Sequence, residues 1–124
     1  MKNAISWFEI PVADYDRAKS FYEKILAAEL VEMDVAGSRM IMLPCDQDPG
    51  VVGGALVENA DMSPSGNGSI VYLEAEPDLS TILDRIIALG NDVPVPKTQI
   101  DEDMGYFAHF IDSEGNRVGL FSKQ

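Results

Sequence analysis

The stretch SWFEIPVADYDRAKSFYEKIL, residues 6–26, decides the fold because it joins a short strand directly to an amphipathic helix. Phe8 and Ile10 alternate with Trp7 and Glu9, a pattern typical of a strand with one buried face. Phe8 and Ile10 are expected to meet the helix. Trp7, the chain's only tryptophan, then lies on the opposite face, where it either plugs a cavity or lines one that binds a ligand.

The second half of this stretch predicts a helix with one buried face. Asp14 or Asp16 can cap its N-terminus. Apolar and aromatic residues then recur at helical spacing, and we expect them to face the core: Ala18, Phe21, Tyr22 and Ile25.

A shift of 64 residues reproduces the pattern. Residues 71–73 match residues 7–9, and Asp78 matches Asp14. The buried face of the second helix is then predicted to consist of Ile82, Ile86 and Leu89. Gly90 suits the end of this helix, because glycine readily adopts the left-handed backbone found there.

Three strand-like segments follow each helix. They are Glu29–Val35, Arg39–Leu43 and Gly53–Val57 in the first half, and Asp92–Val95, Tyr106–Ile111 and Arg117–Phe121 in the second. Pro94 and Pro96 predict that the strand at 92–95 is a short edge strand, followed by a loop with the sequence KTQIDEDMG.

The resulting order is βαβββ, linker, βαβββ, an α+β fold. We interpret residues 1–124 as one domain, with module one at about 1–60, a linker at about 58–69 and module two at about 69–124. A ferredoxin-like βαββαβ fold is the alternative. It has only four strands, so the three candidate strands after each helix favour the eight-strand arrangement.

Composition excludes several classes of function. Nine basic residues face 21 acidic ones, and the net charge of −12 makes nucleic acid a poor partner. No apolar run is long enough to span a membrane, and no signal peptide is evident, so we expect a cytoplasmic protein. Cys45 is the only cysteine and is interpreted as a small apolar filler.

Three stretches resemble those of a known superfamily. They are FEIPVADYDRAKSFYEKIL at 8–26, GVVGGALV at 50–57, and VPKTQIDEDMGYFAHFIDSEGNRVGLF at 95–121. In this order, they resemble the vicinal oxygen chelate superfamily of glyoxalases, bleomycin resistance proteins and dioxygenases. The resemblance implies that two βαβββ modules form paired, curved mixed sheets, each enclosing half of a cavity.

The resemblance also locates the positions at which metal-dependent members carry their ligands. One lies seven residues before the helix-opening aspartate, at Trp7 and, in the second module, at Val71. Another lies seven residues after Asp112, at Gly119, and the remaining one falls near Gly54 or Ala55. None of these side chains can ligate a divalent metal. We therefore expect neither a metal nor another cofactor.

His109 is the only histidine and a candidate acid or base. A five-residue turn at 112–116 pairs Ile111 with Arg117 and places His109 opposite Gly119, on the cavity side. A shift of one residue would turn it toward the helices.

The resemblance implies a small-molecule-binding protein, here without a metal, and because proteins of this fold commonly form twofold dimers we also expect a homodimer. The candidate ligand-binding residues are Trp7, Glu9, Val71, Leu73, His109, Arg117 and Gly119, and an aromatic pocket wall suits flat or cationic ligands. One alternative is a glyoxalase-like lyase or isomerase, either metal-free with His109, Glu9 or Tyr106 as catalytic candidates, or metal-dependent with its ligands misaligned. Another is a bleomycin-type, drug-sequestering resistance protein.

Overall fold

The computed structural model describes residues 3–124. Module one contains β1 (Trp7–Pro11), α1 (Tyr15–Leu26), β2 (Val31–Val35), β3 (Ser38–Met42) and β4 (Gly53–Glu58). Module two contains β5 (Tyr72–Glu74), α2 (Ser80–Ala88), β6 (Val95–Asp101), β7 (Gly105–Ile111) and β8 (Arg117–Ser122). Among these residues, no helix is long and apolar enough to cross a bilayer.

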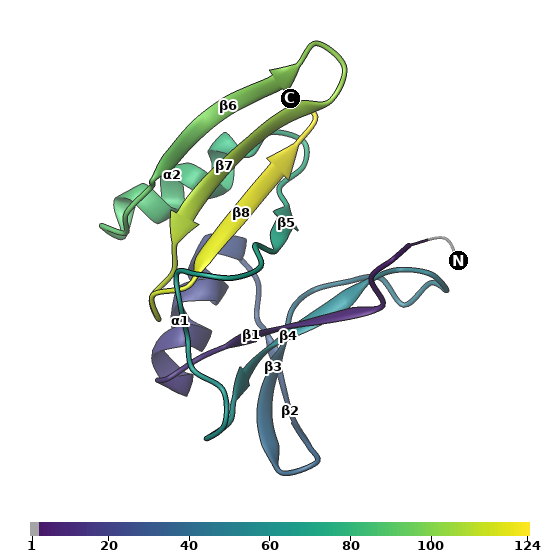
Figure 1. The fold of residues 1–124 in the computed structure, drawn as a ribbon, viewed down its shortest axis with the longest axis vertical. Helices are drawn as coiled ribbons and strands as arrows, with labels where there is room; N and C mark the ends of the chain where they lie inside the picture. Colours follow the sequence, from purple (N-terminus) through teal and green to yellow (C-terminus); the bar gives the residue numbers. More distant parts are fainter. Residues whose placement is uncertain (1–2) are drawn as a thin grey trace.

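Each module contributes one four-stranded sheet (Figure 1). Sheet A has the strand order β1-β4-β3-β2, and sheet B has the equivalent order β5-β8-β7-β6. The β1–β4 and β5–β8 pairs are parallel, whereas the other pairs are antiparallel. The predicted α+β fold with two βαβββ modules is confirmed.

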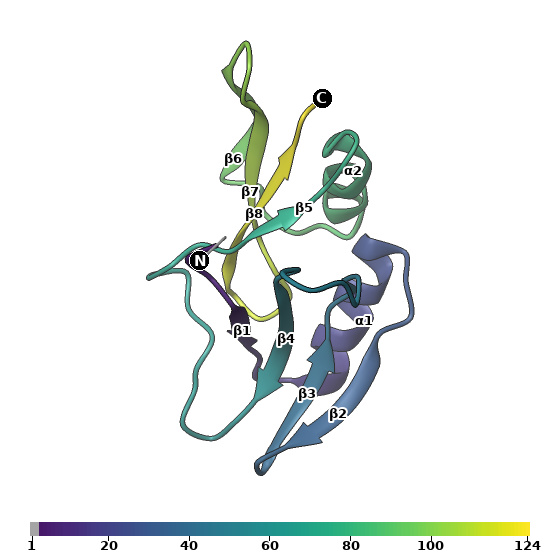
Figure 2. The same ribbon diagram turned by 90° about the vertical axis from the view of Figure 1, so that its right-hand side faces the viewer.

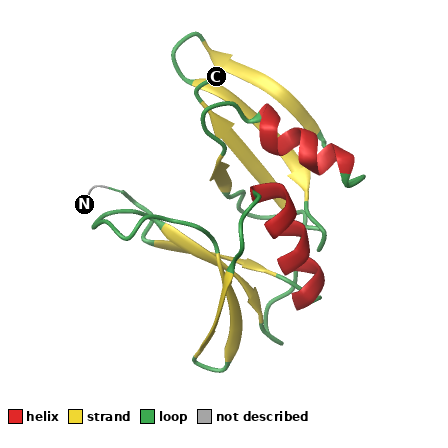
Figure 3. Ribbon diagram, turned by 180° about the vertical axis from the view of Figure 1, so that it is seen from behind, coloured by secondary structure: helices red, strands yellow, loops and turns green. Residues whose placement is uncertain are grey.

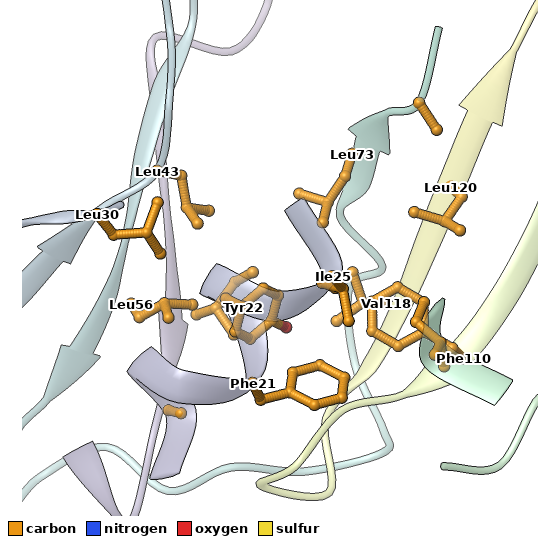
Figure 4. Close-up of a cluster of buried hydrophobic side chains, with 14 of the residues drawn as sticks. Phe21, Tyr22, Ile25, Leu30, Leu43, Leu56, Leu73, Phe110, Val118 and Leu120 are labelled. Atoms are coloured by element: carbon orange, nitrogen blue, oxygen red, sulfur yellow. The ribbon is translucent and has the colours of Figure 1, made fainter. Parts of the chain in front are cut away.

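The two helices lie beside each other on the same side of the sheets (Figures 2 and 3). The predicted face of α1 is buried and contacts both modules. Figure 4 shows Tyr22 and Ile25 between Leu56 of module one and Val118 of module two. Phe21 also packs near Phe110 of β7, with ring centroids 6.2 Å apart. One hydrophobic core therefore serves both modules.

The start of α1 is capped from both modules. The side chain of Asp14 accepts a hydrogen bond from the Arg17 amide at 3.0 Å, as expected of an N-cap. Glu114, in the β7–β8 turn of module two, accepts from the amides of Ala13 and Asp14 at 2.9 and 2.6 Å. It also pairs with the Arg17 guanidinium at 2.7 Å. Module two thus anchors the helix of module one.

Asp112 makes a second connection at the same turn. Its side chain is almost completely buried and accepts a 2.7 Å hydrogen bond from the Tyr22 hydroxyl. It also accepts from the amides of Glu114 and Asn116 at 2.9 Å, while the Asn116 amide group donates to the Pro11 carbonyl at 2.8 Å. The sequence suggested little more than turn chemistry for this segment. In the structure it joins the modules.

The predicted buried face of α2 requires correction. Leu79, Leu83 and Ile86 are buried, whereas Leu89 is 40% exposed and Ile82 is only partly buried. α1 begins directly after Asp14, but α2 begins two residues after Asp78. Because one residue turns a helix by about 100°, the 64-residue alignment misplaced Ile82 and Leu89, whereas Ile86 is buried as predicted.

The predicted strand at 92–95 is also misplaced. β6 begins at Val95 and continues through most of the segment that was predicted to be a loop. It lies at the edge of sheet B, as expected, and its pairing with β7 contains two register shifts. An edge strand tolerates Pro96, and it can be polar because little of it is buried. Its composition therefore resembled that of a loop.

Candidate functional site

The candidate site lies on the faces of the two sheets that point away from the helices, here called open face A and open face B. Phe8 and Ile10 pack in the core, so Trp7 and Glu9 lie on open face A. Ala108 and Phe110 are likewise in the core, which places His109 on open face B. The strands therefore divide core residues from site residues by simple alternation.

Trp7 is 43% exposed and is not enclosed by the core. Its indole N–H donates to the Glu9 carboxylate at 3.2 Å. Its ring lies against Gly53 in the neighbouring strand, where an added Cβ would stand 3.0 Å from the indole Cζ3. Trp7 thus rests on a residue without a side chain and keeps one side open.

A groove of about 1080 Å³ runs between β1 and β5. Trp7 of module one and Val71 and Tyr72 of module two line it together. Leu73 also borders the groove, but most of its side chain lies in the core. A smaller hollow of about 130 Å³ brings Glu9 and Arg117 to a common rim. The two modules therefore share this space.

Three polar side chains form a hydrogen-bonded chain on open face B. Arg117 Nε donates to His109 Nδ1 at 3.0 Å, and His109 Nε2 lies 2.5 Å from the Tyr72 hydroxyl. Burial lowers the pKa of His109, and the nearby Arg117 charge lowers it further. A neutral imidazole that accepts at Nδ1 carries its proton on Nε2. His109 therefore donates to Tyr72.

Gly119 makes room for Tyr72. The two residues are opposite each other in the β5–β8 pair, and a Cβ on Gly119 would collide with the Tyr72 ring. Gly119 is also opposite His109 in the β7–β8 pair, the register that the hairpin predicted. A glycine at this position lets the aromatic ring lie flat across the strand.

Sequence reasoning missed Tyr72. Counting back from Asp78 selected Val71, but Trp7 and Tyr72 each lie eight residues before the first residue of their helix. The better signal was therefore an aromatic residue at the same distance from both helices. In each sheet this residue packs over a glycine of the parallel neighbouring strand.

Two other expectations need correction. Tyr106 packs against the core, and its ring lies 4.6 Å from the Lys97 ammonium, so it does not share a face with His109. Tyr106, Ala108 and Phe110 are spaced two residues apart along β7, so their side chains point to the same, core-facing side of the sheet. Cys45 is exposed beside the groove and is not an enclosed filler, because its segment follows β3 and lies outside the sheet.

The residues at this site do not fit a metal centre. Trp7 and Gly119 lie on the open faces but offer no metal-ligating lone pair. Ala55 is fully buried, and a side chain at Gly54 would meet the Phe8 ring. Among residues 3–124, no group of three or more His, Cys, Asp or Glu side chains could hold a metal ion.

Comparison with known families settles the relationship. The model of the Glyoxalase/Bleomycin resistance protein/Dioxygenase superfamily matches residues 4–120. This chain belongs to that superfamily. No curated protein sequence matches it.

Solved structures of the superfamily share the fold over nearly the whole chain. TnmS3, an antibiotic binding protein from Streptomyces sp. CB03234, is 24% identical, with a TM-score of 0.69 and coverage of 98% of this chain and 97% of that one. A glyoxalase/bleomycin resistance protein from the same organism is 26% identical, with a TM-score of 0.68 and coverage of 96% and 100%. The fosfomycin resistance protein FosX from Listeria monocytogenes is 17% identical, with a TM-score of 0.71 and coverage of 100% and 94%.

Proposed function

We propose that this superfamily member binds a small organic molecule in the groove between its modules and does so without a metal. One observation carries the proposal: Trp7 and Tyr72 occupy equivalent places in the two modules and line one groove. Aromatic side chains supply large contact areas to flat ligands. The chemistry of a metal that polarises a substrate oxygen has no ligand set among the residues described above.

We further propose that the functional unit is a homodimer. Open face A carries an apolar cluster of Met40, Ala55 and Val57, with Met42 and Met62 packed against it. Its outer strand adds the exposed side chains of Val31, Met33 and Val35. A contiguous apolar patch of this kind on a soluble domain is typical of an interaction surface. A second copy is the proposed occupant.

Sequestration of an antibiotic is the second candidate function. Its support is the structural likeness to an antibiotic binding protein, together with the aromatic groove wall. The identity is too low to transfer a ligand, so this candidate rests on the shared fold and on groove chemistry. Binding without turnover would distinguish it from catalysis.

A glyoxalase-like lyase or isomerase is the third candidate. His109 would then act as the acid or base, and its orienting partners are Tyr72 and Arg117. Such a role requires that substrate be consumed, and that His109→Gln remove turnover while leaving binding intact.

Native mass spectrometry and elemental analysis of protein purified without chelator test the proposal. We expect an organic ligand to be retained or readily accepted, and less than about 0.1 equivalent of bound transition metal. Close to one equivalent of metal, with ligand binding that depends on it, would overturn the metal-free proposal.

A further inference from the structure

The hydrogen-bond chain on open face B has a direction. A guanidinium only donates, so Arg117 Nε fixes His109 Nδ1 as an acceptor. The neutral imidazole must then donate from Nε2 to the Tyr72 oxygen. The hydroxyl proton of Tyr72 is left with no acceptor among residues 3–124, and the side chain is 47% exposed.

We propose that the Tyr72 hydroxyl and the Arg117 guanidinium together bind the carboxylate of an aromatic ligand. This inference rests on the proposed function and specifies the class of ligand. Both groups are donors, and hydrogen bonds from such donors to a carboxylate are the stronger, charge-assisted kind. His109 is a positioning residue, because it holds Tyr72 with its proton directed away from the sheet.

The charge environment of Arg117 supports an anion at this place. Arg17, Arg39 and Lys97 each pair with a carboxylate. Arg117 has no carboxylate within 4.0 Å among the described residues, and its side-chain partner is the neutral imidazole of His109. Glu9 lines the same small hollow, but it is not within ion-pair distance, so this guanidinium can contact a ligand.

The overall negative charge favours the opposite ligand and is the competing effect. It repels anions at long range, but at physiological salt it is screened beyond about 8 Å. Arg117 acts at contact distance, where the interaction is strongest. We therefore expect the local guanidinium to determine the preference once a ligand lies beside Tyr72 and Arg117.

Aromatic rings beside these donors suit the body of such a ligand. The ring centroids of Tyr72 and Phe107 are 6.4 Å apart, and those of Phe107 and His109 are 5.6 Å apart. Phe107 and His109 are two residues apart in β7, so both side chains lie on open face B. These ring edges offer contacts to a planar ring system beside the two donors.

Three matched probes test the inference by calorimetric titration at physiological salt: 2-naphthoate, neutral 2-naphthamide and cationic 2-naphthylmethylammonium. We expect 2-naphthoate to bind at least about tenfold more tightly than the other two, as expected for charge-assisted hydrogen bonds. Tyr72→Phe and Arg117→Gln should each weaken 2-naphthoate about tenfold and change 2-naphthamide by less than about threefold.

Arg39→Gln is the matched control, because it removes the same charge from an exposed pair in module one. It should leave 2-naphthoate binding unchanged. If it weakens binding as much as Arg117→Gln, the effect is long-range charge and the inference fails. A ¹⁵N spectrum of the imidazole should show the Nε2–H tautomer, and an Nδ1–H tautomer would overturn the hydrogen-bond chain.

The probe results separate the two proposals. Equal affinity for all three probes, or preference for the cation or the amide, would leave small-molecule binding standing and overturn the carboxylate assignment. If none of the three binds, both the carboxylate assignment and the aromatic-binding groove are wrong.

Discussion

Open face A and open face B are built on the same strand order but carry different chemistry. Face A is dominated by aliphatic and thioether side chains such as Met33 and Met40. Face B carries the hydrogen-bonded chain of Tyr72, His109 and Arg117. One scaffold thus offers an adaptable apolar surface and a preorganised polar one. We interpret the first as suited to association and the second as suited to orienting a ligand.

The difference is clearest where an aromatic residue covers a glycine. Trp7 lies over Gly53, and its indole N–H donates to Glu9 of its own strand. Tyr72 lies over Gly119 and is held from β7 by His109. A side chain held from a second strand loses orientational freedom before a ligand arrives, which lowers the cost of binding.

The largest expected effect tests whether the turn at 112–116 connects the two modules or is an ordinary turn. Asp112→Ala should destabilise the fold by about 3–5 kcal/mol, because it leaves buried donors from Tyr22 and Asn116 without their acceptor. Asp101→Ala is the control, since Asp101 accepts amide hydrogen bonds in an exposed turn. It should cost less than about 1 kcal/mol in urea unfolding. Equal losses would show that the turn at 112–116 does not join the modules.

The second prediction tests whether face A is an association surface. Met33→Lys should weaken the proposed homodimer by about 2–3 kcal/mol, because a charge would enter an apolar interface. Met104→Lys makes the same change at an exposed methionine in the β6–β7 turn and should leave association unchanged. Sedimentation or light scattering across protein concentrations measures both. A wild-type monomer at tens of micromolar would refute the dimer.

The third prediction compares the two glycines directly. Gly119→Ala should lower the free energy of unfolding by about 2 kcal/mol, because the added Cβ would overlap the Tyr72 ring. Gly53→Ala should cost less than about 1 kcal/mol, because the exposed Trp7 ring can move by a few tenths of an ångström. Thermal unfolding of both variants measures the difference. An equal cost would mean that Tyr72 is no more constrained than Trp7.

Trp7 itself provides the fourth test. Trp7→Ala should weaken binding of an aromatic ligand by about 1–2 kcal/mol and lower the unfolding midpoint only slightly, because the side chain is 43% exposed and lies outside the core cluster. Ile87→Ala removes an exposed apolar side chain from α2, outside the groove, and serves as the control. A stability loss of about 3–5 kcal/mol without an effect on binding would instead identify Trp7 as a core plug.

The smallest expected effect is on acid stability. Burial raises the pKa of Glu114, but hydrogen bonds from Arg17, Ser113 and two backbone amides outweigh it, so the pKa is lowered overall. A lowered pKa in the folded state stabilises the fold above the group's ordinary pKa of 4.5, and this contribution is lost as pH falls below it. Glu114→Gln should therefore flatten the decline in the unfolding midpoint below about pH 5. A wild-type slope in the variant would contradict this role.

Sequence reasoning succeeded where the controlling forces are local. Ala18, Phe21, Tyr22 and Ile25 are all buried as their spacing predicts, because a helix places such residues on one face. The hairpin register that pairs Ile111 with Arg117 was also predicted correctly, since the length of the turn sets it. His109 could therefore be assigned a partner strand and a site on open face B. Its role in binding stays a prediction.

Sequence reasoning failed where the structure of a segment depends on packing against residues that are distant in the sequence. β6 has the composition of a loop and became a strand because the free edge of β7 was available for pairing. The buried face of α2 depends on the residue at which the helix begins, and that start is set by packing against the core. The same later start explains why counting back from Asp78 selected Val71, whereas the aromatic residue of the site is Tyr72.

The sequence by itself thus determined the two βαβββ modules, the face of α1 and the register of the last hairpin, because periodicity and turn length are properties of the local chain. Only the tertiary structure decided that Asp112 receives the hydroxyl of Tyr22, 90 residues away, and that Arg117 and His109 orient Tyr72. Such contacts form when strands and helices that are far apart in sequence are brought together by burial of a shared core.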